Sequence, residues 1–381
     1  MNKRRMPTIE LTRIIGCFHV IGLHTITWYT NKNGLLENSL FIRCFLTDGV
    51  PLFWYIMGYF LFVNPNATLT YRLKKAVSTL LLPAFAVMVF SQIWQDWILS
   101  DIGGVSFLSC LDFHSFSFYN LFGNILRWSS DMTFGGHFWY IFSYVQVLLW
   151  TPLLQFVCVD EPKANRCRYY LIGLALLYIV NRDISNITVI SINGNTYPVT
   201  VYSVITPTLL YILIGYETYL HRSWIQKHSS KLLYLGIGGF LLFNLLKYFL
   251  AVQFMRIDPS DSYFLNIGSG LAYLASYCLF IAIYCINIHE NSRLEKVILA
   301  ISSKTLGIYL IHGCVYRKMQ AVGIRSFIYT PYQNHPNNIL IEAFCTFLYA
   351  LIVFVTCYAL VLLLNFLKVM CFRKCLKQKS K

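Results

Sequence analysis

The sequence predicts an all-α fold: a polytopic membrane helical bundle of about ten transmembrane helices, with both chain termini in the cytoplasm. Three observations lead to this prediction: the composition, the recurrence of long apolar segments, and the uneven distribution of Lys and Arg along the chain. Of the 381 residues, 57% are hydrophobic, 17% are aromatic and only 12% are charged, and the mean hydropathy is +0.55. This composition excludes an ordinary soluble domain.

Apolar stretches long enough to cross about 30 Å of hydrocarbon, roughly 20 residues each, recur along the whole chain. The first begins after a basic N-terminal segment and no small-residue cleavage site follows it, so it predicts an uncleaved signal anchor. The fifth is the shortest. The predicted spans are 8–28, 46–63, 76–98, 137–158, 168–182, 199–220, 231–252, 263–288, 300–319 and 339–367.

The net charge of +15 is explained by topology rather than by a nucleic-acid partner. With the N-terminus inside, most of the 31 Lys and Arg residues fall in segments on the inner side of the membrane. Such a bias is typical of cytoplasmic segments. An outer cluster around Arg317 and Arg325 departs from it. We therefore expect contacts with membrane lipid and none with nucleic acid.

We interpret residues 1–381 as a single membrane-embedded domain with two longer outer loops, 99–136 and 181–200, and a basic cytoplasmic tail at 368–381. The aromatic first loop predicts an interfacial or re-entrant piece. In the second loop, a strand-like stretch at 187–192 precedes an Asn193-Gly194 turn signal, which predicts a small hairpin. The 12 cysteines have no spacing typical of a metal site or a disulfide framework.

Two polar residues share one face of the first predicted helix. His24 follows Arg13 by eleven residues, which places the two side chains within about 20° of each other and roughly 16 Å apart along the helix axis. Charged and titratable groups are costly inside a membrane unless they face the bundle interior or a wet cavity, so this stripe predicts a functional site. The alternative is that Arg13 pairs with Glu10, one turn earlier, and that His24 contacts a neighbouring helix.

Four motifs in order carry a family resemblance. Besides Glu10, Arg13 and His24 with TITWY after it, they are VPLFWYIMGYFLF at 50–62, HFWY at 137–140 with TPLL at 151–154, and TLGIYLIH at 305–312. Together they resemble the acyltransferase-3 family of membrane O-acyltransferases, over residues 8 to about 365. Met57 stands where that family usually has Ser. The similarity looks closest to the branch that acetylates surface polysaccharides such as enterobacterial common antigen.

The resemblance implies an acyl-CoA-dependent O-acetyltransferase of the bacterial cytoplasmic (inner) membrane. Acetyl-CoA would be the donor, a hydroxyl of a cell-surface or lipid-linked glycan the acceptor, and no cofactor would be bound permanently. A sugar hydroxyl is a poor nucleophile until a base takes its proton, and histidine, with an unperturbed pKa near ~6.5, suits that role. We assign it to His24. Direct transfer and an acetyl-histidine intermediate both remain open.

The remaining candidates support this chemistry. Arg13 would hold a phosphate of CoA or an anion near the thioester, and its alternative is the structural pair with Glu10. A predicted cytoplasmic cluster, Arg72, Lys74 and Lys75, lies where CoA would present its phosphates, although topology alone also predicts basic residues there.

Further residues have acceptor or supporting roles in the same hypothesis: Glu10, His137, Trp139 and His312. A membrane-interface histidine beside Trp139, as His137 is, is more often an anchor, and His312 is as typical of a buried histidine bonded to a neighbouring helix. His19 lies about 140° around the helix from His24, so we expect it to face elsewhere.

Two other functions are alternatives. A transporter or flippase for a polysaccharide or its precursor fits many spans with polar residues at membrane depth, but it would be expected to have related halves and paired broken helices. A noncatalytic assembly or immunity protein leaves the Arg13 and His24 stripe unexplained.

Overall fold

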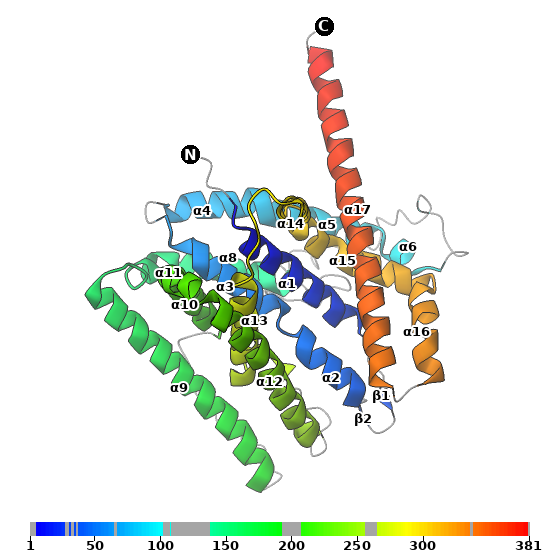
Figure 1. Ribbon diagram of the computed structural model, residues 1–381. Helices are drawn as coiled ribbons and strands as arrows, with labels where there is room; N and C mark the ends of the chain where they lie inside the picture. The colour runs from blue at the N-terminus through cyan, green and yellow to red at the C-terminus, as the bar shows by residue number, and fades with distance from the viewer. Residues whose placement is uncertain are drawn as a thin grey trace. The chain divides into compact units, whose positions relative to one another are not determined.

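The computed structural model consists almost entirely of helices (Figure 1). It describes residues 5–26, 30–31, 34–35, 37–64, 67–101, 107, 138–192, 207–255, 265–335 and 338–379. The helices are α1 (Pro7–Thr25), α2 (Glu37–Leu46), α3 (Gly49–Leu61), α4 (Leu69–Ala76), the π-helical turn η1 (Val77–Leu81), α5 (Leu82–Ile93), α6 (Gln95–Leu99), α8 (Trp139–Gln155), α9 (Pro162–Ile192), α10 (Pro207–Leu220), α11 (Arg222–Lys227), α12 (Ser229–Met255), α13 (Gly270–Tyr284), α14 (Arg293–Ser302), α15 (Thr305–Ala321), α16 (Ile324–Asn334) and α17 (Ile339–Lys379). Strands β1 (Thr30–Asn31) and β2 (Gly34–Leu35) form one short antiparallel hairpin.

The predicted helical membrane class is confirmed. Among the described residues, four helical stretches are long and apolar enough to cross a bilayer: Ser39–Leu61, Leu69–Ile93, Ser229–Gln253 and Ile339–Lys368. Helices α14 and α15, which meet at a 58° bend, add a fifth if they form one broken span. Each of the ten predicted ranges contains helix. The number of crossings and the cytoplasmic position of both termini stay predictions.

Apolar side chains on several helices are exposed in a way that suits lipid rather than water. On α9, Tyr170 and Leu177 are 73% and 67% exposed. On α17, Leu363 and Leu364 are more than half exposed. Soluble proteins rarely display such continuous apolar surface, whereas lipid chains are as apolar as these residues. The protein is therefore a membrane protein.

The chain divides into two compact units, Met1–Leu73 with Tyr144–Lys296, and Lys74–Ser143 with Val297–Lys381. In the first unit, α3 packs against α1, α10 and α13, and α12 packs along α13. The backbones of α3 and α10 come very close at two glycines: a Cβ at Gly58 would overlap the carbonyl oxygen of Ile212, and one at Gly215 would overlap that of Tyr55. Small residues at such crossings are typical of helix packing in membranes.

Tyrosines fill the space between α3, α10 and α13. The Tyr55 hydroxyl donates to the Tyr273 carbonyl at 3.1 Å, and the Tyr59 and Tyr284 hydroxyls lie 3.0 Å apart. The rings of Tyr211 and Tyr273 stack with centroids 4.0 Å apart. Tyr55, Tyr59, Tyr211 and Tyr284 thus bury apolar rings while their hydroxyls keep hydrogen-bond partners.

A buried arginine fixes the junction of α9 and α10. Arg168 pairs with the Glu217 carboxylate, and its Nη1 donates to the Val157 carbonyl at 2.6 Å. Its Nη2 donates to Asn165 Oδ1 at 2.9 Å. Arg168 is fully buried, so these bonds compensate the desolvation of its charge.

In the second unit, α15 packs against α5, α6 and α17, and α16 packs on α17. Lys318 of α15 caps the end of α6, because its Nζ donates to the carbonyls of Trp97 at 2.7 Å and Ser100 at 2.9 Å. Unpaired carbonyls at a helix C-terminus favour a cation in this position.

The predicted strand at 187–192 is wrong. These residues are helical and form the last turns of α9, so the second outer loop cannot begin at 181. Extending an existing helix costs less than starting a new element, and a helix satisfies its own backbone groups in a membrane, so β-branched residues are tolerated there. The Asn193-Gly194 turn and most of the loop predicted at 99–136 lie outside the described residues. In addition, α17 extends through the predicted basic tail to Lys379.

Candidate active site

A buried carboxylate anchors the first helix near its N-terminus. Glu10 is 4% exposed. Its Oε1 accepts from Arg5 Nε at 3.0 Å and its Oε2 from Arg5 Nη2 at 2.6 Å. Arg13 Nη1 lies 3.1 Å from both oxygens. One carboxylate therefore binds two guanidinium groups. The structural pair of Arg13 with Glu10, weighed as an alternative, is present, and Arg5 is a partner that the sequence did not suggest.

Arg13 keeps part of its hydrogen-bonding capacity. Its side chain is 34% exposed, and within the described part of the chain its ion pair uses Nη1. A guanidinium has five N–H donors in a planar fork. The contact with Glu10 thus fixes the position of the group and leaves Nε and Nη2 to meet an anion.

His24 lies in the last turn of α1, at the other end of the stripe. It is half-buried. An unbroken helix of 19 residues carries both groups, so Arg13 and His24 share a face but stand roughly 16 Å apart along the axis. The structure does not bring these two side chains into contact; they can only act on different parts of a long ligand or on different ligands.

His19 lies five residues before His24 on α1. It packs where α1 crosses the start of α3, because a Cβ on Gly49 would come within 2.8 Å of the His19 Cβ. Its Nδ1 is buried and has no hydrogen-bond partner among the residues that the structure describes.

Arg72 binds the chain itself. Its Nε donates to the Ala67 carbonyl at 3.1 Å, its Nη2 to the Asn64 carbonyl at 3.1 Å, and its Nη1 to the Leu61 carbonyl. The guanidinium therefore closes the turn between α3 and α4. Lys74 and Lys75, in contrast, are exposed on α4.

In the second unit, two of the sequence motifs meet. The rings of Tyr140, at the start of α8, and Tyr309, in α15, lie with centroids 6.0 Å apart. His312, one turn after Tyr309, is fully buried, and its Nδ1 lies 2.6 Å from the Tyr309 carbonyl. Trp139 is half-buried next to Tyr140, with the two rings edge to face. His137 lies outside the described residues.

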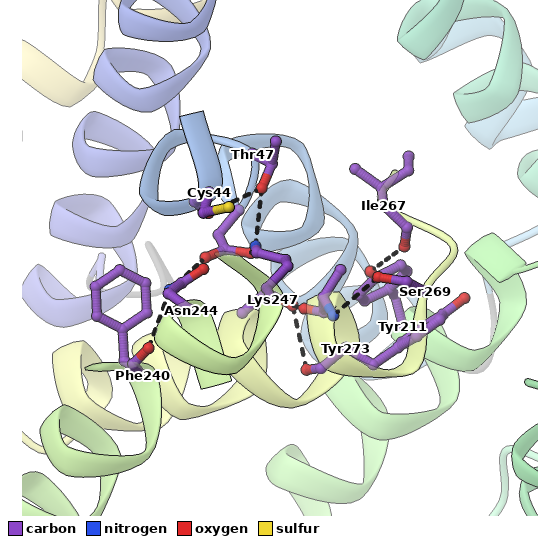
Figure 2. A network of polar contacts seen from close by, with 12 residues as sticks. Cys44, Thr47, Tyr211, Phe240, Asn244, Lys247, Ile267, Ser269 and Tyr273 are labelled. Atoms are coloured by element: carbon purple, nitrogen blue, oxygen red, sulfur yellow. Dashed lines mark hydrogen bonds and ion pairs between the residues drawn. The ribbon is translucent and has the colours of Figure 1, made fainter. Parts of the chain in front are cut away.

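One further polar centre, not predicted from the sequence, joins α12 to the break between α2 and α3. Lys247 Nζ donates to Thr47 Oγ1 at 2.9 Å and to Asp48 Oδ1 at 3.3 Å, and Asn244 Nδ2 donates to Asp48 Oδ2 at 3.2 Å. Figure 2 shows Thr47, Asn244 and Lys247 in this network. We call these four residues the Asp48–Lys247 centre. The sequence contained a signal for this centre: Asp48 and Lys247 each lie in an apolar span. Charged residues at membrane depth usually pair with one another, so an ion pair between them could have been predicted.

Comparison with known proteins gives the class. The family model described as an acyltransferase domain, that of acyltransferase-3, matches residues 6–365. No curated protein and no solved structure matches the chain. The match covers nearly the whole chain, including the helices that carry Glu10, Arg13, His24 and His312. The chain belongs to the acyltransferase-3 family, and the protein is a membrane acyltransferase that moves an acyl group from a donor to an acceptor.

Proposed function

We propose that this acyltransferase transfers acetyl from acetyl-CoA to a hydroxyl of a cell-surface or lipid-linked glycan, as in the branch that modifies surface polysaccharides such as enterobacterial common antigen, and that it works in the bacterial inner membrane. The observation that carries the proposal is the arrangement on α1: a half-buried histidine near one end and, on the same stripe, an arginine held by a buried carboxylate near the other. The arginine end of the helix would bind the acetyl-CoA donor, and the histidine end would activate the acceptor hydroxyl.

His24 is the general base in this proposal. It accepts the proton of the acceptor hydroxyl as the oxygen attacks the acetyl carbonyl, and the C–S bond then breaks to release CoA. Arg13 binds a phosphate of the CoA donor through Nε and Nη2, because a planar fork of donors matches a phosphate. Acetyl-CoA is consumed as a substrate, so the reaction needs no permanently bound cofactor.

Lys74 and Lys75 are the CoA phosphate contacts in this scheme. Their exposure on α4 supports the assignment. Arg72 bonds three carbonyls in the turn before α4. It therefore fixes the start of the helix that carries Lys74 and Lys75. Direct phosphate binding by Arg72 stays a prediction of the sequence. Trp139, His137 and His312 keep their proposed supporting role toward the acceptor.

The central test uses purified protein in nanodiscs with radiolabelled acetyl-CoA and a lipid-linked glycan. We expect His24→Ala to abolish label transfer while the protein still inserts and folds, because the substitution removes the base and an apolar residue does not oppose insertion. His19→Ala, on another face of the same helix, should lose much less activity.

Near-normal transfer by His24→Ala would overturn the base assignment. Equal losses in the two histidine variants would show that the face of α1 does not discriminate between them. Movement of unmodified glycan across the membrane without label transfer would favour a transporter instead.

A further inference from the structure

The Asp48–Lys247 centre places two charges inside the membrane. Asp48 lies within the apolar stretch Ser39–Leu61 and Lys247 within Ser229–Gln253. Both side chains, like that of Asn244, are 0% exposed. Ionisable residues in spans are rare and mark functional regions by default.

Stability is a weak explanation for such a pair. Removing two charges from water costs several kcal/mol per ion, and replacing a buried pair by apolar residues is often neutral or stabilising. Two buried polar atoms at the same place, Asn244 Oδ1 and His19 Nδ1, have no hydrogen-bond partner among the described residues. Buried polar atoms of this kind are uncommon and call for an explanation.

The position of the pair indicates what that explanation is. Thr47 and Asp48 are the break between α2 and α3, and α12 holds one side of this joint through Lys247 and Asn244. The next residue, Gly49, faces α1: a Cβ there would lie 2.8 Å from the Gly16 carbonyl oxygen and 2.9 Å from Val20 N.

Contact between the joint and α1 continues toward His24. A Cβ at Gly22 would lie 3.1 Å from Leu46 Cδ2, at the last residue of α2. The stretch of α1 from Gly16 to Gly22 therefore rests directly on the joint, and His24 follows two residues later. At Gly16 and Gly49 no side chain separates the two backbones, so a change in the angle between α2 and α3 would move this part of α1.

We propose that Asp48 and Lys247 are positioning residues for the acyl transfer: the ion pair fixes the α2–α3 joint, the joint seats the outer half of α1, and α1 sets the place of His24. This inference rests on the function proposed above. Neither charged group touches the substrate. Displacement of a reacting group by about 1 Å through a distant change can lower the rate by up to 10²-fold, which is the size of effect that such a joint controls.

The test compares single variants, which leave one buried charge without its partner, with a double variant that removes both charges. Asp48→Asn and Lys247→Met each strand one buried charge and serve to measure folding. The double variant Asp48→Asn with Lys247→Met removes both charges and should melt near the wild-type temperature. The double variant Arg168→Met with Glu217→Gln is the matched control, since it likewise removes both charges of a buried ion pair, the one that joins α9 to α10.

Two readouts are taken in nanodiscs. Hydrogen exchange of the α1 backbone is independent of activity, and the kinetics of acetyl transfer give kcat and KM separately. In the double variant we expect α1 to exchange faster, kcat to fall about 10- to 100-fold, and KM for acetyl-CoA to stay within about twofold. The Arg168→Met, Glu217→Gln control should change neither the α1 exchange nor kcat.

A double variant with wild-type α1 exchange and wild-type kcat overturns the inference and leaves the pair a structural one. If the double variant has faster α1 exchange but the wild-type protein itself transfers no acetyl group, the two proposals separate. The contact between the α2–α3 joint and α1 is then established, and the proposed function fails. A fall in kcat with unchanged α1 exchange also rejects positioning through α1.

Discussion

At the residue scale, the first helix illustrates how a charge can be both structural and chemical. Glu10 accepts from two arginines, and its burial makes the carboxylate depend on them. The spacing offered the pair of Glu10 with Arg13 as the alternative to a functional stripe, because residues three apart share a helix face. It could not predict Arg5, which reaches Glu10 from outside the helix, since the path of an irregular segment is not encoded in a simple period.

Arg13→Lys tests whether the guanidinium matters beyond its charge. An ammonium can still pair with Glu10, but it cannot hold that carboxylate and a second anion in the planar geometry of a fork. We expect kcat/KM for acetyl-CoA to fall at least about tenfold, equivalent to about 1.4 kcal/mol of transition-state stabilisation. Steady-state transfer kinetics measure this.

The companion variant Glu10→Gln separates the two roles of Arg13. If Arg13 acts only through its pair, Arg13→Lys should keep full activity and Glu10→Gln should change stability alone. Coupling between the two positions, read from the double variant, then reports how far the carboxylate orients the guanidinium.

At the scale of elements, apolar length predicted where helices lie, and pairing between distant segments decided where they break. The span predicted at 46–63 contains α3, yet the structure adds α2 from Glu37 and breaks the helix at Thr47 and Asp48. The partner that stabilises this break, Lys247, is about 200 residues away. Local patterns cannot reveal such a partner. The same limit explains why the strand predicted at 187–192 is wrong: these residues continue the preceding helix α9 despite their local β-propensity.

Close helix crossings give a prediction for α3 and α10. Gly58→Ala places a methyl group against the Ile212 carbonyl, so the helices must separate and the protein should lose about 1–3 kcal/mol of stability or more. Thermal unfolding in detergent measures the loss as a lower midpoint.

Gly238→Ala is its control. That glycine lies in α12, and apart from its own stretch of helix backbone no atom of the described residues would lie within 4 Å of a Cβ there. The substitution should therefore be neutral or slightly stabilising, because alanine is favoured over glycine inside a helix by roughly 0.5–1 kcal/mol. Equal midpoints for the two variants would mean that the α3–α10 crossing relaxes without cost.

At the scale of the whole molecule, composition was enough to predict a helical membrane protein, because no soluble fold leaves so little charge for its surface. The order of four motifs was enough to predict the family, which the match over residues 6–365 confirms. The predicted orientation in the membrane, with the N-terminus in the cytoplasm, depends on the distribution of Lys and Arg. This orientation predicts from which side each substrate approaches.

If the N-terminus is cytoplasmic, Arg13 lies toward the CoA pool and His24 roughly 16 Å nearer the outer face. Acetyl-CoA should then enter from the inner side with its thioester reaching toward His24, while the glycan approaches from outside. Vesicles of known protein orientation, given radiolabelled acetyl-CoA on the cytoplasmic side alone and glycan in the opposite compartment, should accumulate labelled glycan. His24→Ala vesicles, loaded in the same way, supply the background. Transfer that occurs only when both substrates share the cytoplasmic side would reject the transmembrane route even with His24 essential, because the base would then be reached from the same side as the donor.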